Sequence, residues 1–388
     1  MKVVTAKRAI AMMSAVPLLA FGLSIQQPIS ASAAACGSGT AYSGSGTEAD
    51  PYLIDTKENL IYFSATDEDW SGWFLQTSDI DLEGCDWTPI GGDYNAYYVG
   101  INQGFTGVYD GGGHSISGLS VTSDSTLNAH GMFGFLNGEV KDLNLIDVDI
   151  NGGLNVGGLA GWFDTGARAD RVTVSGTLSG GRGVGGLVGY MDRGIVTDSY
   201  STASITGEAW SGNSPSWIGG LLGHFYGDSD DLITSFSTGL VSAPGGASLI
   251  GGLVGRGSAT LTDSFWDTES SGQSSSPAGT GKTTAEMTSF ATFDDAGWDI
   301  VDGWEAYDFD NPTNEWGICS GANDGYPFLL WQFSEDPCSV DSGDSNQQTS
   351  SAGDSDPGVP GIYLTVKGRS GDTASGSLIG FGGFAVAP

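Results

Sequence analysis

Apolar residues recur in a fixed pattern through the middle of this chain. A glycine, two apolar residues and a second glycine form a motif at 131–134, 158–161, 186–189, 220–223 and 252–255. The starts of successive motifs are 27, 28, 34 and 32 residues apart. This spacing is typical of repeat proteins, in which a unit of about 30 residues cannot bury its apolar side alone and stacks on its neighbours.

A strand-like stretch follows each motif, at 140–150, 171–178, 196–205, 232–241 and 261–266. In the first stretch Ile146, Val148 and Ile150 alternate with polar residues, as in a strand with one buried face. The last three stretches share a polar residue, a serine and an aromatic residue: Asp198-Ser199-Tyr200, Thr234-Ser235-Phe236 and Asp263-Ser264-Phe265. No amphipathic helix of ten residues interrupts the repeats. The pattern predicts an all-β repeat fold, a β-solenoid of the parallel β-helix kind, with a β-sandwich of short antiparallel strands as the alternative.

The rest of the chain divides around these repeats. The predicted segments are a signal peptide (1–35), an N-terminal cap (36–95), the repeats (96–270), a C-terminal cap (271–333), a flexible acidic linker (334–360) and part of a further β module (361–388). Caps are expected because an uncovered terminal unit exposes an open strand edge. The linker is rich in Ser, Asp and Gly, which favours a flexible chain.

Two short helices are predicted within the caps. The first runs from Asp55 to Ser64, with Thr56 or Asp55 as its N-cap. The second begins at Thr283, where a Thr-x-x-Glu sequence forms a capping box.

The first 35 residues have the layout of a secretory signal. Lys2, Lys7 and Arg8 precede an apolar run at 9–25, and small residues with Ala-x-Ala spacing follow. No second apolar stretch approaches the roughly 20 residues that span a bilayer. The sequence therefore predicts a secreted protein, extracellular or at the cell surface, with no membrane span in the mature chain.

Four cysteines support the same compartment. Cys36 and Cys85 lie near the start, and Cys319 and Cys338 lie near the end. Four cysteines allow three connectivities, and pairing each residue with its near neighbour is favoured because it ties down both ends of the domain. A metal site is disfavoured, since there is no C-x-x-C pair and histidine is scarce.

Composition narrows the function. The 388 residues include 64 Gly, and 46 acidic residues against 13 basic ones give a net charge of −33. Binding to nucleic acid as a main role is excluded, because it needs clustered Lys and Arg. Apolar residues at 39% and aromatic residues at 11% exclude a disordered acidic chain.

The repeats resemble the GLUG motif of secreted and cell-surface bacterial proteins. The flanking segments also resemble that family, at 37–40, 44–53, 79–82, 87–91, 105–116, 265–267, 281–283, 297–299 and 325–329. The resemblance covers roughly residues 36 to 333. It implies an extracellular β-solenoid of adhesin-like proteins, also found beside the catalytic part of immunoglobulin-A-cleaving metallopeptidases, and it brings no catalytic residues with it.

Histidines and neighbouring carboxylates are the candidate catalytic groups of this chain. A zinc peptidase needs H-E-x-x-H, but none of His114, His130 and His224 is followed by Glu. A glycoside hydrolase or polysaccharide lyase needs two neighbouring carboxylates. Pairs that share a strand face occur at Asp147/Asp149, Asp79/Asp81 and Asp228/Asp230. A secreted carbohydrate-active enzyme is therefore an alternative function, and a purely structural stalk is another.

Acidic clusters raise the question of calcium, which takes six to eight oxygen ligands. The candidates are 67–69, Asp79 with Asp81 and Glu83, and Asp228 with Asp230 and Asp231. No EF-hand or other calcium motif is present, so a solvated acidic surface is favoured. The sequence predicts no cofactor.

A ligand-binding loop is predicted in the longest repeat interval. Trp210, Asn213 and Trp217 lie there among polar residues, and insertions in stacked repeats project as loops. The two indoles could stack on sugars or contact a protein. The alternative for Trp217 is a core position beside Ile218. The sequence thus predicts a monomeric, non-catalytic adhesion module whose partner is a glycan or a host or matrix protein.

Overall fold

The described part of the chain is mostly β-structure. The computed structural model describes residues 35–92, 104–122, 128–208, 216–226, 231–244, 249–257, 260–308 and 313–339. Strand pairing between the repeat units is parallel throughout the sheets described below. The predicted all-β class with parallel strands is confirmed, and the antiparallel sandwich alternative is wrong.

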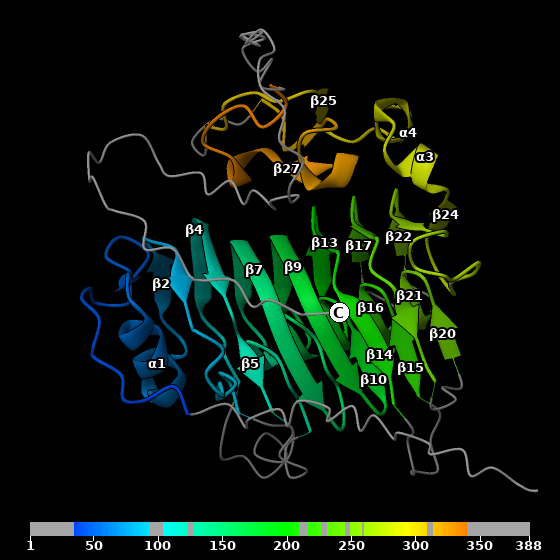
Figure 1. Ribbon diagram of the computed structural model, residues 1–388. Helices are drawn as coiled ribbons and strands as arrows, with labels where there is room; N and C mark the ends of the chain where they lie inside the picture. Colours follow the sequence, from blue (N-terminus) through cyan, green and yellow to red (C-terminus); the bar gives the residue numbers. More distant parts are fainter. Residues whose placement is uncertain are drawn as a thin grey trace, which may run out of the picture. The chain divides into compact units, whose positions relative to one another are not determined.

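One large sheet receives strands from every repeat unit. Its longest strands, β4 (Val108–Ser117), β7 (Glu139–Gly152) and β9 (Arg168–Gly180), lie side by side in Figure 1. Later units divide the same path into shorter strands: β12 (Ile195–Thr197), β13 (Tyr200–Ser201), β14 (Ser204–Gly207), β17 (Asp231–Ile233), β18 (Phe236–Ser237), β19 (Val241–Ser242), β22 (Thr260–Thr262) and β23 (Phe265–Asp267). At the N-terminal end, β2 (Trp73–Gln76) pairs with β4 and with the edge strand β1 (Tyr52–Ile54), β3 (Ile80–Asp81) pairs with β4, and β5 (Ser120–Val121) pairs with β7. The opposite edge is β24 (Thr280–Lys282), which pairs with β23.

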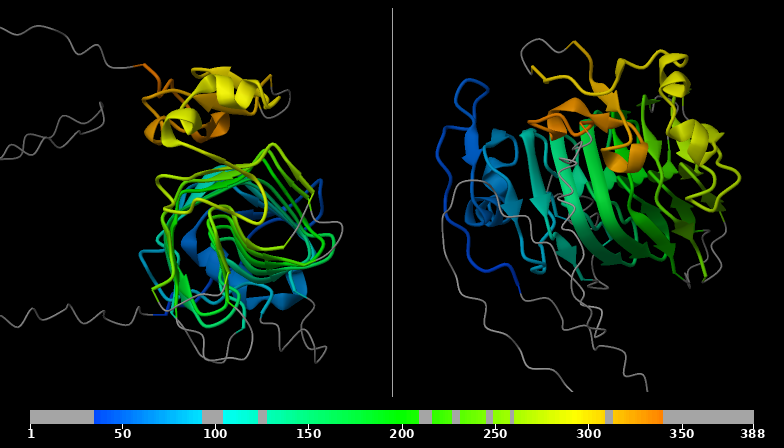
Figure 2. Two further views of the ribbon diagram at one scale, coloured as in Figure 1. Left: turned by 90° about the vertical axis from the view of Figure 1, so that its right-hand side faces the viewer. Right: turned by 45° about the horizontal axis from the view of Figure 1, so that its top comes forward.

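The glycine motifs build two further sheets. In each unit, a strand begins at the third residue of the motif. These strands form a five-stranded sheet in the order β21 (Val254–Arg256), β16 (Leu222–Phe225), β11 (Val188–Met191), β8 (Ala160–Phe163) and β6 (Phe133–Leu136). The strand before each of the last three motifs gives a three-stranded sheet, β10 (Gly183–Gly185), β15 (Trp217–Gly219) and β20 (Leu249–Gly251). In the left view of Figure 2 the traces of successive units overlie one another.

The leucines of the motifs are stacked in register. The amide of Leu159 donates to the carbonyl of Leu187 (3.0 Å), and the amide of Leu187 donates to that of Leu221 (2.9 Å). The amide of Leu221 in turn donates to the carbonyl of Leu253 (2.9 Å). All four side chains are fully buried in one core cluster. The units therefore share a continuous apolar core.

Close approach between units explains the motif glycines. A Cβ on Gly186 would lie 2.4 Å from the carbonyl oxygen of Gly220, and one on Gly220 would lie 2.2 Å from that of Gly252. Real Cβ atoms do not approach an oxygen so closely. Neither glycine has a positive φ, so space rather than backbone freedom requires glycine here.

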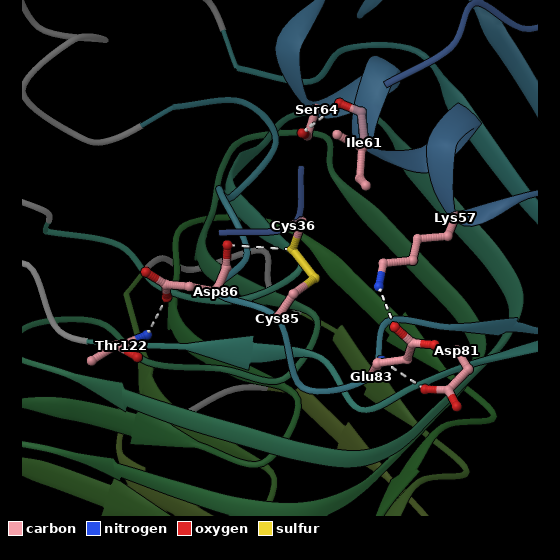
Figure 3. Close-up of a disulfide and its surroundings, with 9 residues drawn as sticks. All are labelled: Cys36, Lys57, Ile61, Ser64, Asp81, Glu83, Cys85, Asp86 and Thr122. Carbon is pink, nitrogen blue, oxygen red and sulfur yellow. Dashed lines mark hydrogen bonds and ion pairs between the residues drawn. A yellow bond between two sulfur atoms is a disulfide. The ribbon is translucent and has the colours of Figure 1, made fainter. Parts of the chain in front are cut away.

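The N-terminal cap carries the predicted helix and disulfide. Helix α1 (Lys57–Ala65) follows Thr56, whose hydroxyl accepts a hydrogen bond from the amide of Asn59 (3.2 Å). Cys36 is bonded to Cys85, as Figure 3 shows, and Cys319 is bonded to Cys338. The predicted pairing of near neighbours is confirmed.

Removing the α1 cap should have a measurable cost. We expect Thr56→Ala to lower the free energy of unfolding by about 1 kcal/mol, because the Asn59 amide loses its acceptor. Chemical denaturation of the full chain measures this, with Thr56→Ser as the control that retains the hydroxyl. Equal stabilities for the Ala and Ser variants would contradict the capping role.

The polar-Ser-aromatic steps form a corner of the large sheet. Asp198, Thr234 and Asp263 have φ values of 46°, 45° and 48°, and each redirects the chain at this point. The serine that follows each of them then lies between units. The Ser235 hydroxyl accepts a hydrogen bond from the Ser199 amide (3.2 Å), and the Ser264 hydroxyl accepts one from the Ser235 amide (3.3 Å).

The aromatic residues of these steps lie outside the central core. Tyr200 and Phe236 are stacked, with ring centroids 4.8 Å apart, and belong to a second buried cluster together with Phe265. The C-terminal segment supplies the other side of this cluster, including Trp298 and Trp316. This segment contains α3 (Thr284–Met287), α4 (Phe290–Asp294), β25 (Ile300–Asp302), β26 (Trp316–Ile318) and β27 (Phe328–Leu329).

Polar contacts fix the C-terminal segment along the flank of the repeats. Trp316 Nε1 donates to Asp198 Oδ1 (3.0 Å), and Tyr200 Oη donates to Gln332 Oε1 (3.0 Å). Helix α3 has the predicted capping box, in which the Thr283 amide donates to Glu286 Oε2 (2.8 Å). The sequence predicts a cover for the last unit, whereas the described contacts of this segment extend over several units.

Several predicted features lie outside the described residues. They are residues 1–34 of the signal peptide, the linker from residue 340 onward, the β module at 361–388, and Trp210, Asn213, Asp228 and Asp230. These remain predictions. In the part of the chain that the structure describes, no helix is long and apolar enough to cross a membrane.

Candidate functional site

Register brings one row of large flat side chains together on the five-stranded sheet. Phe135 of β6 pairs with Trp162 of β8, and Trp162 pairs with Tyr190 of β11. Tyr190 pairs with His224 of β16, and His224 pairs with Arg256 of β21. Each residue directly follows the second glycine of its motif. Five units therefore place one residue each in what we call the aromatic row.

The rings of the aromatic row contact one another. Trp162 and Tyr190 are stacked, with centroids 4.0 Å apart and planes 18° apart. Phe135 lies parallel to Trp162 at 5.9 Å, and His224 meets Tyr190 edge-on at 4.8 Å. Trp162 and Tyr190 are half-buried, so their edges remain accessible from outside.

The three-stranded sheet supplies the facing wall. Trp217 begins β15, pairs with Gly183 of β10 and stacks on His224 with centroids 4.2 Å apart. Two guanidinium groups lie over the indole of Trp217, with the Cζ of Arg182 4.5 Å and that of Arg256 5.3 Å from the ring centroid. Such cation–π contacts hold both charges at the same place.

A cavity of about 340 Å³ lies between these walls. Its lining residues are Asn128, Leu154, Asn155, Trp162, Arg182, Tyr190 and Trp217. Gly183 occupies the position that Trp217 fills in the next unit, so a side chain is missing there. A Cβ on Gly183 would lie 3.0 Å from Asn155 Oδ1, and the glycine therefore keeps this space open.

Several polar atoms around the cavity have no hydrogen bond to any described residue. They are Trp217 Nε1, Arg182 Nε and His224 Nδ1. The side chain of Trp217 is only 3% exposed and that of His224 only 5%. Buried polar groups normally have partners, so the unsatisfied donors of the cavity-lining residues Trp217 and Arg182 indicate a place for a ligand.

His224 is uncharged at neutral pH. Burial, together with the positive charges of Arg256 and Arg182, lowers the pKa of its imidazole to about 4. Among the described residues around the cavity, the two arginines therefore supply the positive charge.

The pKa of His224 gives a direct test of this arrangement. We expect an NMR titration midpoint near 4 for His224, well below the ordinary value of about 6.5. The Arg256→Met variant should raise that midpoint, because it removes a repelling charge. His224→Gln assigns the signal, and a midpoint near 6.5 in the unchanged protein would contradict the buried placement.

The predicted ligand-binding residues are only partly described. Trp217 lies in a strand and is buried, as the core alternative predicts, but it also lines the cavity. Trp210 and Asn213 lie outside the described residues, so their role in a binding loop stays a prediction. The aromatic row was not among the features predicted from the sequence. The sequence pattern that could have indicated it is the residue after the second glycine of each motif, which is Phe, Trp, Tyr, His and Arg in the five motifs in turn.

Carboxylates of the two described acidic clusters have partners within the protein, whereas Asp228 and Asp230 lie outside the described residues. Asp69 accepts hydrogen bonds from the hydroxyls of Tyr42 and Tyr52, and Glu83 pairs with Lys57 at 3.0 Å (Figure 3). Asp81 accepts from the amide of Glu83 (2.7 Å). Among the described residues, no group of three or more His, Cys, Asp or Glu is placed to hold a metal ion.

The carboxylate pairs considered for the enzyme alternative do not line the described cavity, and Asp228 and Asp230 lie outside the described residues. Asp147 and Asp149 are exposed on the large sheet, and Thr177 donates a hydrogen bond to Asp149 (3.2 Å). Asp79 contacts His114 (3.5 Å) and accepts from the amide of Ser115 (2.8 Å). Neither pair lines the cavity described above.

Comparison with known proteins gives limited likeness. No protein-family model matches the chain. A protein provisionally named as a Gly-rich membrane protein, from Evansella cellulosilytica, is 35% identical over 125 residues, which are 31% of this chain and 14% of that protein. Halomucin from Haloquadratum walsbyi is 27% identical over 272 residues, which are 62% of this chain and 3% of halomucin. The chain thus spans a small part of the length of both relatives.

One solved structure resembles the fold. It is the crystal structure of a protein from Bacteroides ovatus provisionally assigned as an immunoglobulin A1 protease. The two structures superpose with a TM-score of 0.54 at 17% identity, covering 74% of this chain and 94% of that one. At this identity the likeness concerns the fold alone.

Proposed function

We propose that this chain is an exported, non-catalytic β-solenoid of the GLUG type that binds a ligand at the cell surface or in the extracellular matrix. The cavity beside the aromatic row is the observation that carries the proposal. It combines accessible ring edges with buried donors that lack partners among the described residues. Sites that bind small ligands are commonly concave and aromatic with a few placed polar groups.

Other observations support export and the stacked architecture. The two disulfides suit an oxidising compartment, and one relative is named as a membrane protein. Parallel pairing between consecutive units and the leucine stack fit a β-solenoid. The GLUG assignment depends on the motifs in the sequence.

A binding screen tests the proposal. The full chain is applied to an array of neutral and acidic glycans and to immobilised matrix proteins, and we expect saturable binding to at least one of them. The Tyr190→Ala variant should weaken that binding by about tenfold or more, because Tyr190 lines the cavity. Tyr62→Ala is the control, since Tyr62 is also half-buried but lies on α1.

Two further measurements make the screen decisive. Denaturation curves show whether the Tyr190→Ala variant is folded, and glycan length after incubation shows whether any glycan is cleaved. Absence of binding by the folded, unchanged protein would contradict the proposal. Cleavage of a bound glycan would favour the enzyme alternative instead.

A further inference from the structure

We propose that the cavity beside the aromatic row binds a sugar that carries a carboxylate, with the carboxylate placed at Arg182 and Trp217. This inference rests on the proposed binding function and adds the chemical class of the ligand. A uronic acid and a sialic acid both have this chemistry, which is a sugar ring that carries a carboxylate.

The charge of the site is the first argument. The chain carries a net charge of −33, yet two of its few arginines lie over the same indole. Neither Arg182 nor Arg256 forms an ion pair with a described carboxylate, whereas four of the six other described basic residues do, namely Lys57, Lys141, Arg171 and Arg193. Two neighbouring positive charges repel each other, and an anion between them relieves that repulsion.

The polar atoms at the cavity are the second argument. Trp217 Nε1 and Arg182 Nε can only donate hydrogen bonds, and neither has a described acceptor. A carboxylate accepts several hydrogen bonds, and those from a guanidinium are strengthened by charge. The donors therefore match an acidic group better than a hydroxyl or an amide.

The shape and lining of the cavity are the third argument. The open position above Gly183 is bordered by Asn155 Oδ1, and the Asn155 amide nitrogen is already engaged with the carbonyl of Asn128 (3.0 Å). Oδ1 is thus an acceptor that faces the space, next to the edges of Trp162 and Tyr190. A sugar ring supplies hydroxyl donors and apolar C–H groups for these surroundings.

An acidic peptide fits the site less well. Extended peptides commonly bind by adding a strand to an open sheet edge. The strands of both walls are already paired, since β11 pairs with β8 and β16, and β15 pairs with β10 and β20. The outer side of β10 is bonded to Val156, whose amide donates to the carbonyl of Gly183 (2.7 Å). A peptide backbone would find no unpaired edge on these strands.

Calorimetry with matched probes tests the inference. Trigalacturonate, its methyl triester, 3′-sialyllactose, lactose and a hexaglutamate peptide are titrated into the full chain. We expect at least one of the two acidic sugars to bind. It should bind about tenfold or more tightly than its neutral counterpart, with the difference falling as salt is raised.

Two variants of equal charge locate the contact. Arg182→Gln should weaken binding of the acidic sugar about tenfold or more, because it removes the charged donor at the cavity. Arg168→Gln is the control, since Arg168 is exposed on β9 and does not line the cavity. Denaturation curves for both variants establish that each is folded.

The outcomes separate this inference from the proposed function. Equal affinity for a neutral sugar and its acidic counterpart would overturn the inference that the ligand carries a carboxylate, while the proposed glycan binding would still stand. If hexaglutamate binds as tightly as the acidic sugars and loses as much affinity in Arg182→Gln, the inference that the ligand is a sugar is overturned. If none of these probes binds while the array finds another ligand, the inference alone fails, and if nothing binds at all, both proposals fail.

Discussion

Replacing Arg171 by Met should lower the free energy of unfolding by about 3 to 5 kcal/mol at neutral pH. Arg171 Nε lies 2.6 Å from Asp142 Oδ1, and its Nη2 lies 3.2 Å from Asp142 Oδ2. Asp142 is only 3% exposed, so the variant leaves a buried carboxylate without its main partner. Breaking one side of a buried ion pair is strongly destabilising for this reason.

The penalty should depend on pH. Burial raises the pKa of Asp142, and Arg171 opposes that rise. Without Arg171 the pKa of Asp142 in the folded state lies still further above its value in the unfolded chain. The penalty is then largest above the folded-state pKa of the variant and fades as the pH falls, because below the ordinary value of 3.8 Asp142 is mostly protonated in both states.

Denaturation at several pH values checks both parts of this expectation. Arg193→Met is the matched control, because the Arg193 side chain is 52% exposed and pairs with Asp192 on the surface. Its cost should stay below about 1 kcal/mol. Equal losses in the two variants, or a loss in Arg171→Met that does not change with pH, would contradict the buried pair.

Truncating one leucine of the stack should cost about 2 to 5 kcal/mol. Leu221 is fully buried between Leu187 and Leu253, and Leu221→Ala removes its side chain while keeping the backbone hydrogen bonds between units. The lost burial and the remaining cavity both destabilise the folded state. Chemical denaturation measures the effect.

Leu240→Ala is the control for this truncation. Leu240 is 52% exposed, so the same change of residue should alter the free energy of unfolding by about 0.5 kcal/mol or less. If Leu221→Ala were equally mild, the leucines could not form the core that stabilises the stack.

The repeat architecture was largely predictable because its signals are local. The motif glycines and the helix caps at Thr56 and Thr283 each depend on residues close in sequence. The disulfides join cysteines 49 and 19 residues apart, and they were predictable because each pair lies near one end of the domain. The burial of the leucines follows from their position between two glycines that tolerate no side chain.

The aromatic row was harder to predict because its members differ in chemistry. Phe135, Tyr190 and Arg256 have no common residue type, and only the parallel register shows that they lie in one row. The open space at Gly183 was equally hard to predict, since it is recognised only when Gly183 is paired with Trp217 of the next unit.

The flank covered by the C-terminal segment depends on backbone geometry. Residues such as Asp198 have a positive φ, which ends the regular alternation of buried and exposed positions. Tyr200 and Phe236 therefore belong to the second cluster with Trp316 instead of the central core. Alternation along the sequence could not reveal this change of side.

The C-terminal segment also affects how the protein unfolds. Gln332 contacts Thr173, and Tyr326 donates a hydrogen bond to Asp267, so one short stretch is tied to units at both ends of the later array. An array held only by nearest neighbours can fray from one end. Here the later units cannot detach without breaking their contacts with the C-terminal segment. Heating or pulling should therefore unfold these units in a single sharp transition, not one unit at a time.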